Sequence, residues 1–159
     1  MITISTATLA DAEAILALQK LAYQSEARIY DDWSIPPLTQ TIESLRGEFG
    51  TSLVLKALSG ARLVGSVRAT LAAGTCTIGR LIVEPEFQKQ GIGSKLLQSV
   101  EAECGSSSKF ELFTGTKSEA NIRLYKRHGY SIARTEQLSP NVLIVFLEKP
   151  GPAAWEGDS

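Results

Sequence analysis

The sequence predicts a mixed α/β (α+β) fold in which helices cover both faces of one sheet. Apolar segments of strand length and amphipathic segments of helical length follow one another in the order β-α-α-β-β-β-α-β-α-β-β. Elements that alternate in this way are typical of a single sheet with helices on both faces. Residues 142–147 are apolar without alternation, which predicts a central strand covered on both sides.

The individual elements follow from hydrophobic periodicity and from cap and turn residues. Strands are expected at residues 2–7, 53–58, 62–71, 75–83, 110–113, 130–137 and 142–148. Helices are expected from Thr8 to residues 25–29, over residues 39–48, from Gly91 to Gly105, and from Thr116 to Gly129. Residues 8–11 and 116–119 match the capping-box pattern that opens a helix. The two prolines in residues 30–37 predict a loop, because proline restricts its own backbone and that of the preceding residue.

Chain length and charge predict one ordinary globular domain. The 159 residues are 43% apolar and carry a net charge of −1 without a long run of one sign, which gives no support for nucleic-acid binding. Residues 1–149 are expected to form the domain and residues 150–159 a loosely attached tail. No apolar run approaches the roughly 20 residues of a membrane span, and no basic segment precedes the first apolar residues. We therefore expect a cytoplasmic protein without membrane contact.

The chain has one histidine and two cysteines. Cys76 and Cys104 are well separated and form no Cys-x-x-Cys pair, so we expect buried small apolar side chains and no metal site. His128 stands directly before Gly129 at a predicted helix end. A cation there interacts favourably with the last carbonyls of the helix, so a structural role is expected for His128.

Residues 79–100 carry the most informative motif. An apolar strand runs into a loop that reads Gln-Lys-Gln-Gly-Ile-Gly at residues 88–93, and an amphipathic helix follows. Gly91 and Gly93 allow a sharp turn and close approach of a ligand to the backbone. The first N–H groups of a helix have no partner within it, and the helix dipole favours anions there. The segment therefore predicts a phosphate-binding turn, although neither the triphosphate P-loop nor the three-glycine dinucleotide pattern is present.

The same segment resembles the cofactor signature of the GNAT-type (Gcn5-related) N-acetyltransferases. That signature, Gln/Arg-x-x-Gly-x-Gly/Ala after a strand ending in Val-x-Pro, is matched by Gln88, Gly91 and Gly93 and by Val83 and Pro85. The resemblance spans residues 2–148 and implies the GNAT fold, a mixed and mostly antiparallel sheet of about seven strands with helices on both faces. It also implies that acetyl-CoA is the cofactor. The implied cofactor-binding residues are Leu81, Ile82, Val83, Gln88, Lys89, Gln90, Gly91, Ile92, Gly93, Ser94, Asn121 and Tyr125.

A second segment resembles the GNAT pattern in the helix after the fifth strand. Asn121, Tyr125 and Gly129 occupy the positions of Asn-x-x-x-Tyr-x-x-x-Gly. By resemblance, Tyr125 protonates the coenzyme A thiolate, because a phenol can donate a proton to sulfur. Asn121 lies one helical turn earlier on the same face and would bind the pantetheine arm.

The general base is less clearly marked than the acid. Some family members carry a glutamate on the strand before the loop, but residues 75–80 contain no carboxylate. Glu26 is the candidate base, since Tyr23, Glu26 and Tyr30 fall on one helical face. Tyr30 or an ordered water chain are alternatives for the base, and Glu26 could instead be a surface residue. The residues expected to bind the acceptor are Tyr23, Glu26, Tyr30, Trp33 and Arg80, with Asp31, Asp32, Ile35 and Arg68 as further candidates.

These observations predict direct transfer of an acetyl group to a primary amine of a small molecule within a ternary complex. Two other functions stay open. One is a GNAT-like module that binds acyl-CoA with little or no turnover, and the other is a protein or peptide N-acetyltransferase. A hydrolase that uses a serine with His128 is less favoured, because no Gly-x-Ser-x-Gly motif occurs. Many relatives are dimers, so a homodimer is an alternative to the monomer.

Overall fold

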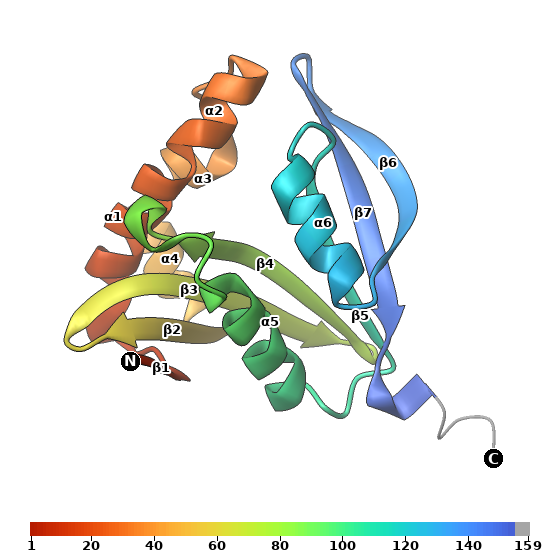
Figure 1. Cartoon of the computed structure of the whole chain (residues 1–159), viewed down its shortest axis with the longest axis horizontal. Coiled ribbons are helices and arrows are strands. Elements are labelled where there is room, and N and C mark those ends of the chain that lie inside the picture. Colours follow the sequence, from red (N-terminus) through yellow and green to blue (C-terminus); the bar gives the residue numbers. More distant parts are fainter. Residues whose placement is uncertain (155–159) are drawn as a thin grey trace.

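Seven strands form one open sheet in the computed structural model, which describes residues 1–154 (Figure 1). The spatial order is β1-β2-β3-β4-β5-β7-β6, and β4 and β5 are the parallel pair among antiparallel neighbours. The predicted fold class is thus confirmed, and β7 is the interior strand that its apolar sequence predicted. The strands are β1 (Ile2–Thr6), β2 (Leu53–Ser59), β3 (Arg62–Ala72), β4 (Thr75–Val83), β5 (Lys109–Gly115), β6 (Ser131–Ser139) and β7 (Val142–Pro150).

Helices cover the sheet on both faces, with α5 and α6 in front of it in Figure 1 and α4 behind it. The alternating side chains of β2 show why both faces are buried. Leu55 packs in the cluster that contains the apolar stripe of α5, whereas the neighbouring Val54 packs with residues of α1 and α4. The helices are α1 (Ala12–Ala22), α2 (Gln24–Tyr30), α3 (Pro36–Thr39), α4 (Ile42–Glu48), α5 (Ile92–Glu103) and α6 (Glu119–Arg127), with 3-10 turns η1 (Leu9–Asp11) and η2 (Pro85–Phe87).

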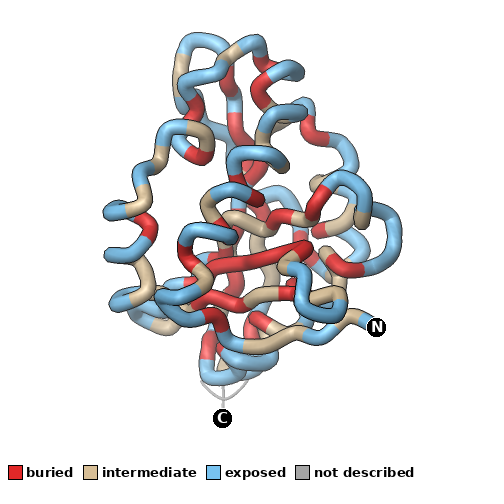
Figure 2. The backbone as a smooth tube through the Cα atoms, turned by 90° about the vertical axis from the view of Figure 1, so that its left-hand side faces the viewer, coloured by how far each residue is buried: buried red, intermediate tan, exposed pale blue. Residues whose placement is uncertain are grey.

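The hydrophobic core lies along the inner strands and along the inward stripe of α5. Buried backbone is concentrated in the strands and on the inner sides of the helices, while the turns are exposed (Figure 2). The fully buried stripe of α5 consists of Ile92, Leu96, Leu97 and Val100, at the spacing expected for a helix packed on a sheet. This packing fixes the start of α5, and with it the preceding loop, against the end of β4.

Two local predictions are wrong. Pro36 and Pro37 open the short helix α3 instead of forming a loop, because the first positions of a helix need no backbone N–H donor. The predicted capping box at residues 116–119 is absent, since α6 begins at Glu119 and the Ser118 side chain makes no cap. The box at residues 8–11 is present, where Thr8 N–H donates to Asp11 Oδ2 at 2.9 Å.

β4 and β5 part soon after they meet. Their register pairs run from Thr75 opposite Lys109 to Thr77 opposite Glu111, and no pair follows. Beyond this point, β4 also bulges against β3, because Arg80 and Leu81 share the single position opposite Val67. Arg80 has φ of +51°, a left-handed conformation that is uncommon for a residue with a side chain. The two strands therefore leave a wedge whose β4 side is a bulged segment.

The aromatic ring of Tyr30 packs across the wide end of this wedge. Tyr30 extends from α2 to the end of β5, where its hydroxyl accepts a hydrogen bond of 2.7 Å from Lys117 N–H. A Cβ atom on Gly115 would lie 1.9 Å from the Tyr30 hydroxyl, so glycine is required for this approach. The contact ties α2 to the sheet on the far side of the wedge.

The end of the described chain is attached to the sheet. Gly151 N–H and Ala153 N–H donate to the carbonyls of Ser108 and Ser107. The remaining five residues of the predicted tail lie outside the described residues, so the division into a domain and a tail stays a prediction. None of the helices in residues 1–154 has the length and apolar character needed to cross a bilayer.

Gly115→Ala should destabilise the protein by about 1–3 kcal/mol, since the new methyl group would displace the buried Tyr30 ring. Urea unfolding followed by fluorescence measures the change. Gly47→Ala is the matched control, because a Cβ atom there meets nothing within 4 Å inside α4. This control should leave stability unchanged or raise it by up to about 1 kcal/mol. Equal stabilities of the two variants would contradict the seating of Tyr30 on Gly115.

Candidate active site

A groove of about 430 Å³ runs between the loop before α5 and the first turn of α6. We call it the outer groove. Its floor is the end of β4, and α2 forms its upper wall. The lining residues are Ala22, Tyr23, Ser25, Glu26, Ile29, Leu81, Ile82, Val83, Phe87, Gln88, Lys89, Gly91, Ile92, Gly93, Ser94, Lys117, Ser118, Glu119, Ala120, Asn121, Leu124 and Arg127.

The loop presents a row of free backbone donors at one end of the outer groove. Within the described chain, the N–H groups of residues 89–94 donate to no carbonyl and to no side chain. Lys89 and Gly91 have φ of +65° and +83°, so the backbone turns twice through the left-handed region. Such turns at a helix start direct N–H groups to one side and form an anion-binding nest.

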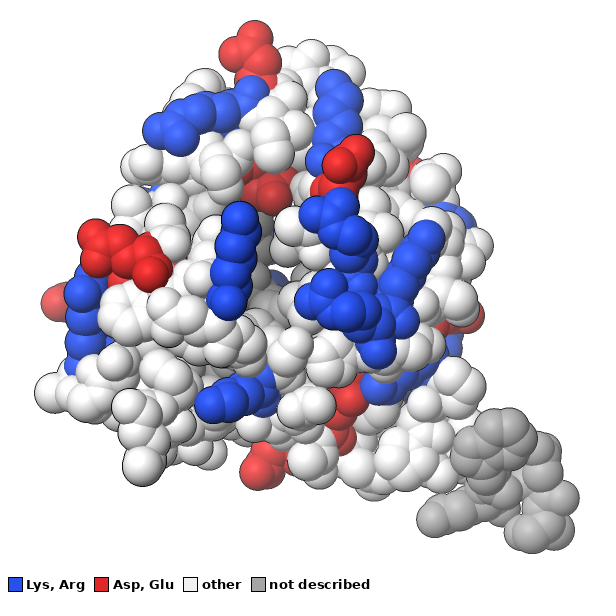
Figure 3. Space-filling view, viewed as in Figure 1, with Lys and Arg blue, Asp and Glu red and all other residues white. Residues whose placement is uncertain are grey.

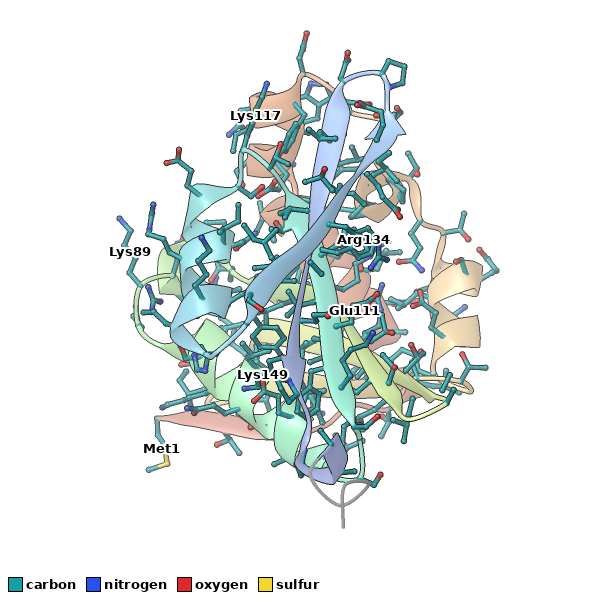
Figure 4. All side chains as sticks on the ribbon, turned by 90° about the vertical axis from the view of Figure 1, so that its right-hand side faces the viewer. Met1, Lys89, Glu111, Lys117, Arg134 and Lys149 are labelled. Carbon is teal, nitrogen blue, oxygen red and sulfur yellow. The ribbon has the colours of Figure 1, made fainter. Side chains whose placement is uncertain are left out.

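Positive side chains surround the same groove. Lys89, Lys117 and Arg127 line it, and Figure 3 shows Lys and Arg side chains gathered around a hollow in this face of the molecule. In Figure 4, Lys89 and Lys117 extend from the α6 side, whereas Arg134 and Glu111 lie on the other side of the C-terminal strands. The charges thus favour a polyanionic ligand at the outer groove.

A second cavity, of about 150 Å³, lies in the wedge between β4 and β5. We call it the inner cavity. It shares Tyr23, Glu26, Leu81 and Asn121 with the outer groove, so the two spaces meet at these residues. Its full lining is Tyr23, Glu26, Tyr30, Ile35, Pro36, Pro37, Ile78, Gly79, Arg80, Leu81, Phe113, Thr114, Gly115, Asn121, Tyr125, Leu138, Val142 and Ile144.

Tyr125 projects from α6 into the inner cavity. Its side chain is 6% exposed, and its hydroxyl has no hydrogen-bond partner among residues 1–154. Burial raises the pKa of Tyr125 above its ordinary value of 10.0, and the nearby Tyr23 and Glu26 raise it further. The phenol is therefore held in its protonated form and can act as a proton donor.

Glu26 and Asn121 lie where the two spaces join, on opposite sides of the opening. Ser118 Oγ donates to Glu26 Oε2 at 2.5 Å, which links α2 to the start of α6. Asn121 Nδ2 donates to Thr114 Oγ1 at 3.2 Å, which fixes α6 on β5. The Ser118 hydroxyl serves this long-range contact and is therefore unavailable as a helix cap.

The two arginines considered for the acceptor site have different surroundings. Arg80 lines the inner cavity, while Arg68 is absent from its lining. Arg68 is buried beneath α1 and α4, where Nη1 donates to Gln19 Oε1 at 3.0 Å and Nε lies 3.1 Å from Glu48 Oε1. Arg68 thus connects the helices to β3, and its suggested role in the cleft is wrong.

Most of the predicted cofactor residues lie together in the outer groove. The exceptions are Gln90, which is outside both spaces, and Tyr125, which lies in the inner cavity. Among the acceptor residues, Tyr23, Glu26, Tyr30 and Arg80 line the inner cavity, whereas Trp33 is 52% exposed and lines neither space. Asp31, Asp32 and Arg68 are also outside, and Ile35 is inside. The groove residues missed from the sequence include Lys117, Ser118 and Arg127, which flank the Asn121–Tyr125 motif; Lys117 and Arg127 carry positive charge.

His128 and the cysteines play no part in the inner cavity. His128 follows α6 as its C-terminal cap, and its Nε2 lies 3.0 Å from Ser94 Oγ, which connects α6 to the first turn of α5. Cys76 and Cys104 are both buried and line neither space. Burial raises the pKa of the Cys76 thiol, which disfavours the thiolate.

A sheet whose two parallel strands part, a loop of free amides at a helix start and a tyrosine in the wedge are features that fit the resemblance to the GNAT family. The family model described as acetyltransferase (GNAT) family matches residues 13–130. The chain belongs to the acetyltransferase (GNAT) family. The resemblance found in the sequence is confirmed.

Individual relatives are more distant. UPF0157 protein YqkA of Bacillus subtilis (strain 168) is 27% identical over 133 residues, which is 84% of this chain and 38% of that protein. The ribosomal-protein-S18-alanine N-acetyltransferase from Escherichia coli has a TM-score of 0.79 at 18% identity, with 94% of each chain covered. The PaiA N-acetyltransferase from Thermoplasma acidophilum, in complex with coenzyme A, has a TM-score of 0.77 at 18% identity, with 94% of this chain and 99% of that chain covered. At 18% identity, these two solved structures show that this chain has the same fold as each of them.

Proposed function

We propose that this protein transfers an acetyl group from acetyl-CoA to the primary amine of a small molecule, in a single ternary complex. The observation that carries the proposal is the row of free N–H groups at residues 89–94, placed at one end of a groove that leads to Tyr125. The row offers donors for a diphosphate, and the wedge beyond it offers space for a thioester.

The outer groove has the donors that coenzyme A needs. The amides of residues 89–94 would hold the pyrophosphate, and Lys117 and Arg127 would neutralise the remaining phosphate charge. Gln88 Nε2 donates to the Val83 carbonyl at 3.4 Å and so joins the loop to the end of β4. The coenzyme A complex of the Thermoplasma acidophilum enzyme, which has the same fold, supports this assignment.

The parting of β4 from β5 supplies the next requirement. Past Thr77, the edge of β4 that faces β5 has no ladder partner, so its N–H and C=O groups are available to the pantetheine arm. Acetyl-CoA supplies the acetyl group as a thioester, whose carbonyl oxygen gains negative charge during transfer. A backbone N–H of residues 81–83 would stabilise that charge as a preorganised donor.

Two side chains would move the protons, one at the junction and one in the inner cavity. Glu26 receives a proton from the amine as the new carbon–nitrogen bond forms. Tyr125 gives its proton to sulfur as the carbon–sulfur bond breaks, and its raised pKa keeps that proton in place until then. The products are an N-acetylated amine and free coenzyme A thiol, so no further reactant is needed.

The structure favours direct transfer over a covalent enzyme intermediate. A cysteine route would require a thiolate beside the thioester, but both cysteines are buried away from the two spaces. The Ser94–His128 contact is the nearest approach to the hydrolase alternative. Ser94, however, is part of the phosphate loop and does not line the inner cavity.

Two other functions stay open: a non-catalytic module that binds acyl-CoA, and an enzyme with a protein acceptor. An assay of thiol release with free amines distinguishes our proposal from both. The cytoplasmic location and the homodimer stay predictions.

Gly91→Val should weaken coenzyme A binding at least tenfold. A β-branched residue at φ of +83° carries about 1–3 kcal/mol of strain, which would distort the amide row. Calorimetric titration with coenzyme A measures the loss. Gly60→Val is the matched control, since Gly60 has φ of +61° in the open turn between β2 and β3. It should lower thermal stability similarly and leave coenzyme A affinity intact; unchanged affinity in Gly91→Val would contradict the loop assignment.

Tyr125→Phe should lower kcat about 100-fold, the usual range for loss of a general acid, and change coenzyme A affinity less than twofold. Because the pKa of Tyr125 is raised, this phenol stays protonated between pH 6 and pH 9. Its deprotonation should therefore not lower wild-type kcat in this range. Assays of thiol release measure kcat and its pH dependence, and calorimetric titration measures coenzyme A affinity. Tyr130→Phe is the control, since its hydroxyl donates to Glu101 outside both spaces. Equal turnover in Tyr125→Phe and Tyr130→Phe would remove Tyr125 from the mechanism.

A further inference from the structure

Arg80 is an uncompensated cation in the inner cavity. Within residues 1–154, no carboxylate forms an ion pair with Arg80, and its buried Nε atom has no hydrogen-bond partner. The cavity wall around it is largely apolar, with isoleucine, proline, leucine, phenylalanine and valine side chains. A guanidinium in such surroundings is costly unless an anion pairs with it.

Arg68 differs from Arg80 in having a carboxylate partner, although the Nε atom of Arg68 also lacks a hydrogen bond. Arg68 has Gln19, Gln40 and Glu48 as partners. Burial lowers the pKa of Arg68, Glu48 opposes this, and the charge of Arg80 lowers it further. The two guanidinium groups thus repel each other while Arg80 has no carboxylate of its own.

The backbone of Arg80 is also held in an unfavourable conformation. Arg80 is one of the two residues of the β4 bulge, and its φ of +51° is disfavoured for an arginine. Such strain is concentrated at functional sites, where it directs a side chain to a particular place. Here Arg80 and the neighbouring Leu81 both line the inner cavity.

The carboxylate of Glu26 lines the same cavity as Arg80. Both Arg80 and Glu26 act on the phenol of Tyr23, whose pKa is raised by burial, lowered by Arg80 and raised by Glu26. Tyr23 therefore stands near both charges. One anionic group, one cationic group and apolar walls in one enclosed space are complementary to a zwitterion with an apolar side chain.

We propose that the acceptor is an α-amino acid with an apolar side chain, whose carboxylate is bound by Arg80 and whose amine lies beside Glu26. This inference rests on the proposed function and names its substrate class. The planar guanidinium can pair with a carboxylate through two parallel hydrogen bonds, which also orients the amine. Ile78, Phe113 and Ile144 supply part of the apolar wall for the side chain.

The test compares three amines that share one side chain: L-leucine, L-leucinamide and 3-methylbutylamine. With the wild-type protein and acetyl-CoA, kcat/KM for thiol release should be at least about 30-fold higher for L-leucine than for the other two, because they lack the charge that pairs with Arg80. Arg80→Gln should remove this preference by lowering kcat/KM for L-leucine, mainly through KM. It should lower the rate with 3-methylbutylamine by a much smaller factor than the rate with L-leucine.

Arg123→Gln is the matched control, since Arg123 is exposed on α6, pairs with Glu119 and lines neither space. It should retain the preference. An Arg80→Gln variant that loses activity equally with all three amines would show that Arg80 acts on the thioester or is needed for folding. That result would overturn the inference. A wild-type preference for 3-methylbutylamine or L-leucinamide would also overturn it, while leaving acetyl transfer intact.

Calorimetric titration of the coenzyme A complex with N-acetyl-L-leucine adds a readout that needs no turnover. Binding should be lost in Arg80→Gln and kept in Arg123→Gln, and binding that persists in Arg80→Gln would contradict the carboxylate site. Absence of thiol release with every amine would remove the proposed function, and the inference with it. If a peptide with an N-terminal leucine is acetylated in preference to free L-leucine, the acceptor is a protein. That result would overturn the inference that the acceptor is a free amino acid.

Discussion

The early parting of β4 from β5 is the constraint on which the rest of the site depends. The two parallel strands share register pairs only up to Thr77 and Glu111. The wedge beyond them contains the inner cavity, and it exposes the β4 backbone toward the outer groove. A parallel pair that continued to the end of β4 would fill this space and leave no cavity behind the loop at residues 88–94.

The elements around the wedge keep it open by contacts that are distant in sequence. Tyr30 from α2 packs on Gly115 of β5, and Ser118 donates to Glu26 across the junction. The buried Arg68 cluster holds α1 and α4 against β3 on one side, and α6 is fixed on β5 through Asn121 and Thr114. The site is therefore a gap between two well-packed halves of the sheet, with Glu26 at its mouth and Tyr125 inside it.

The parts of this arrangement that could be predicted from sequence are those set by local chemistry. The succession of strands and helices along the chain, the loop at residues 88–93 and the spacing of Asn121 and Tyr125 are all visible in short segments. Contacts that depend on distant partners were missed. Ser118 fits a capping pattern locally but bonds Glu26 92 residues away, and Arg68 resembles Arg80 in sequence context yet is enclosed by Gln19 and Glu48. The bulge at Arg80 has no signature of its own, since a change of register appears only when β3 and β4 pair.

The account is tested most directly by following every backbone amide by nuclear magnetic resonance while coenzyme A is added to the ¹⁵N-labelled protein. If the wedge and its loop hold the thioester carrier, the largest shift changes will fall on residues 81–83 and 89–94, and the amides of β1 and β6 will stay in place. Changes confined to other parts of the sheet, or no saturable change at all, would contradict the central claim.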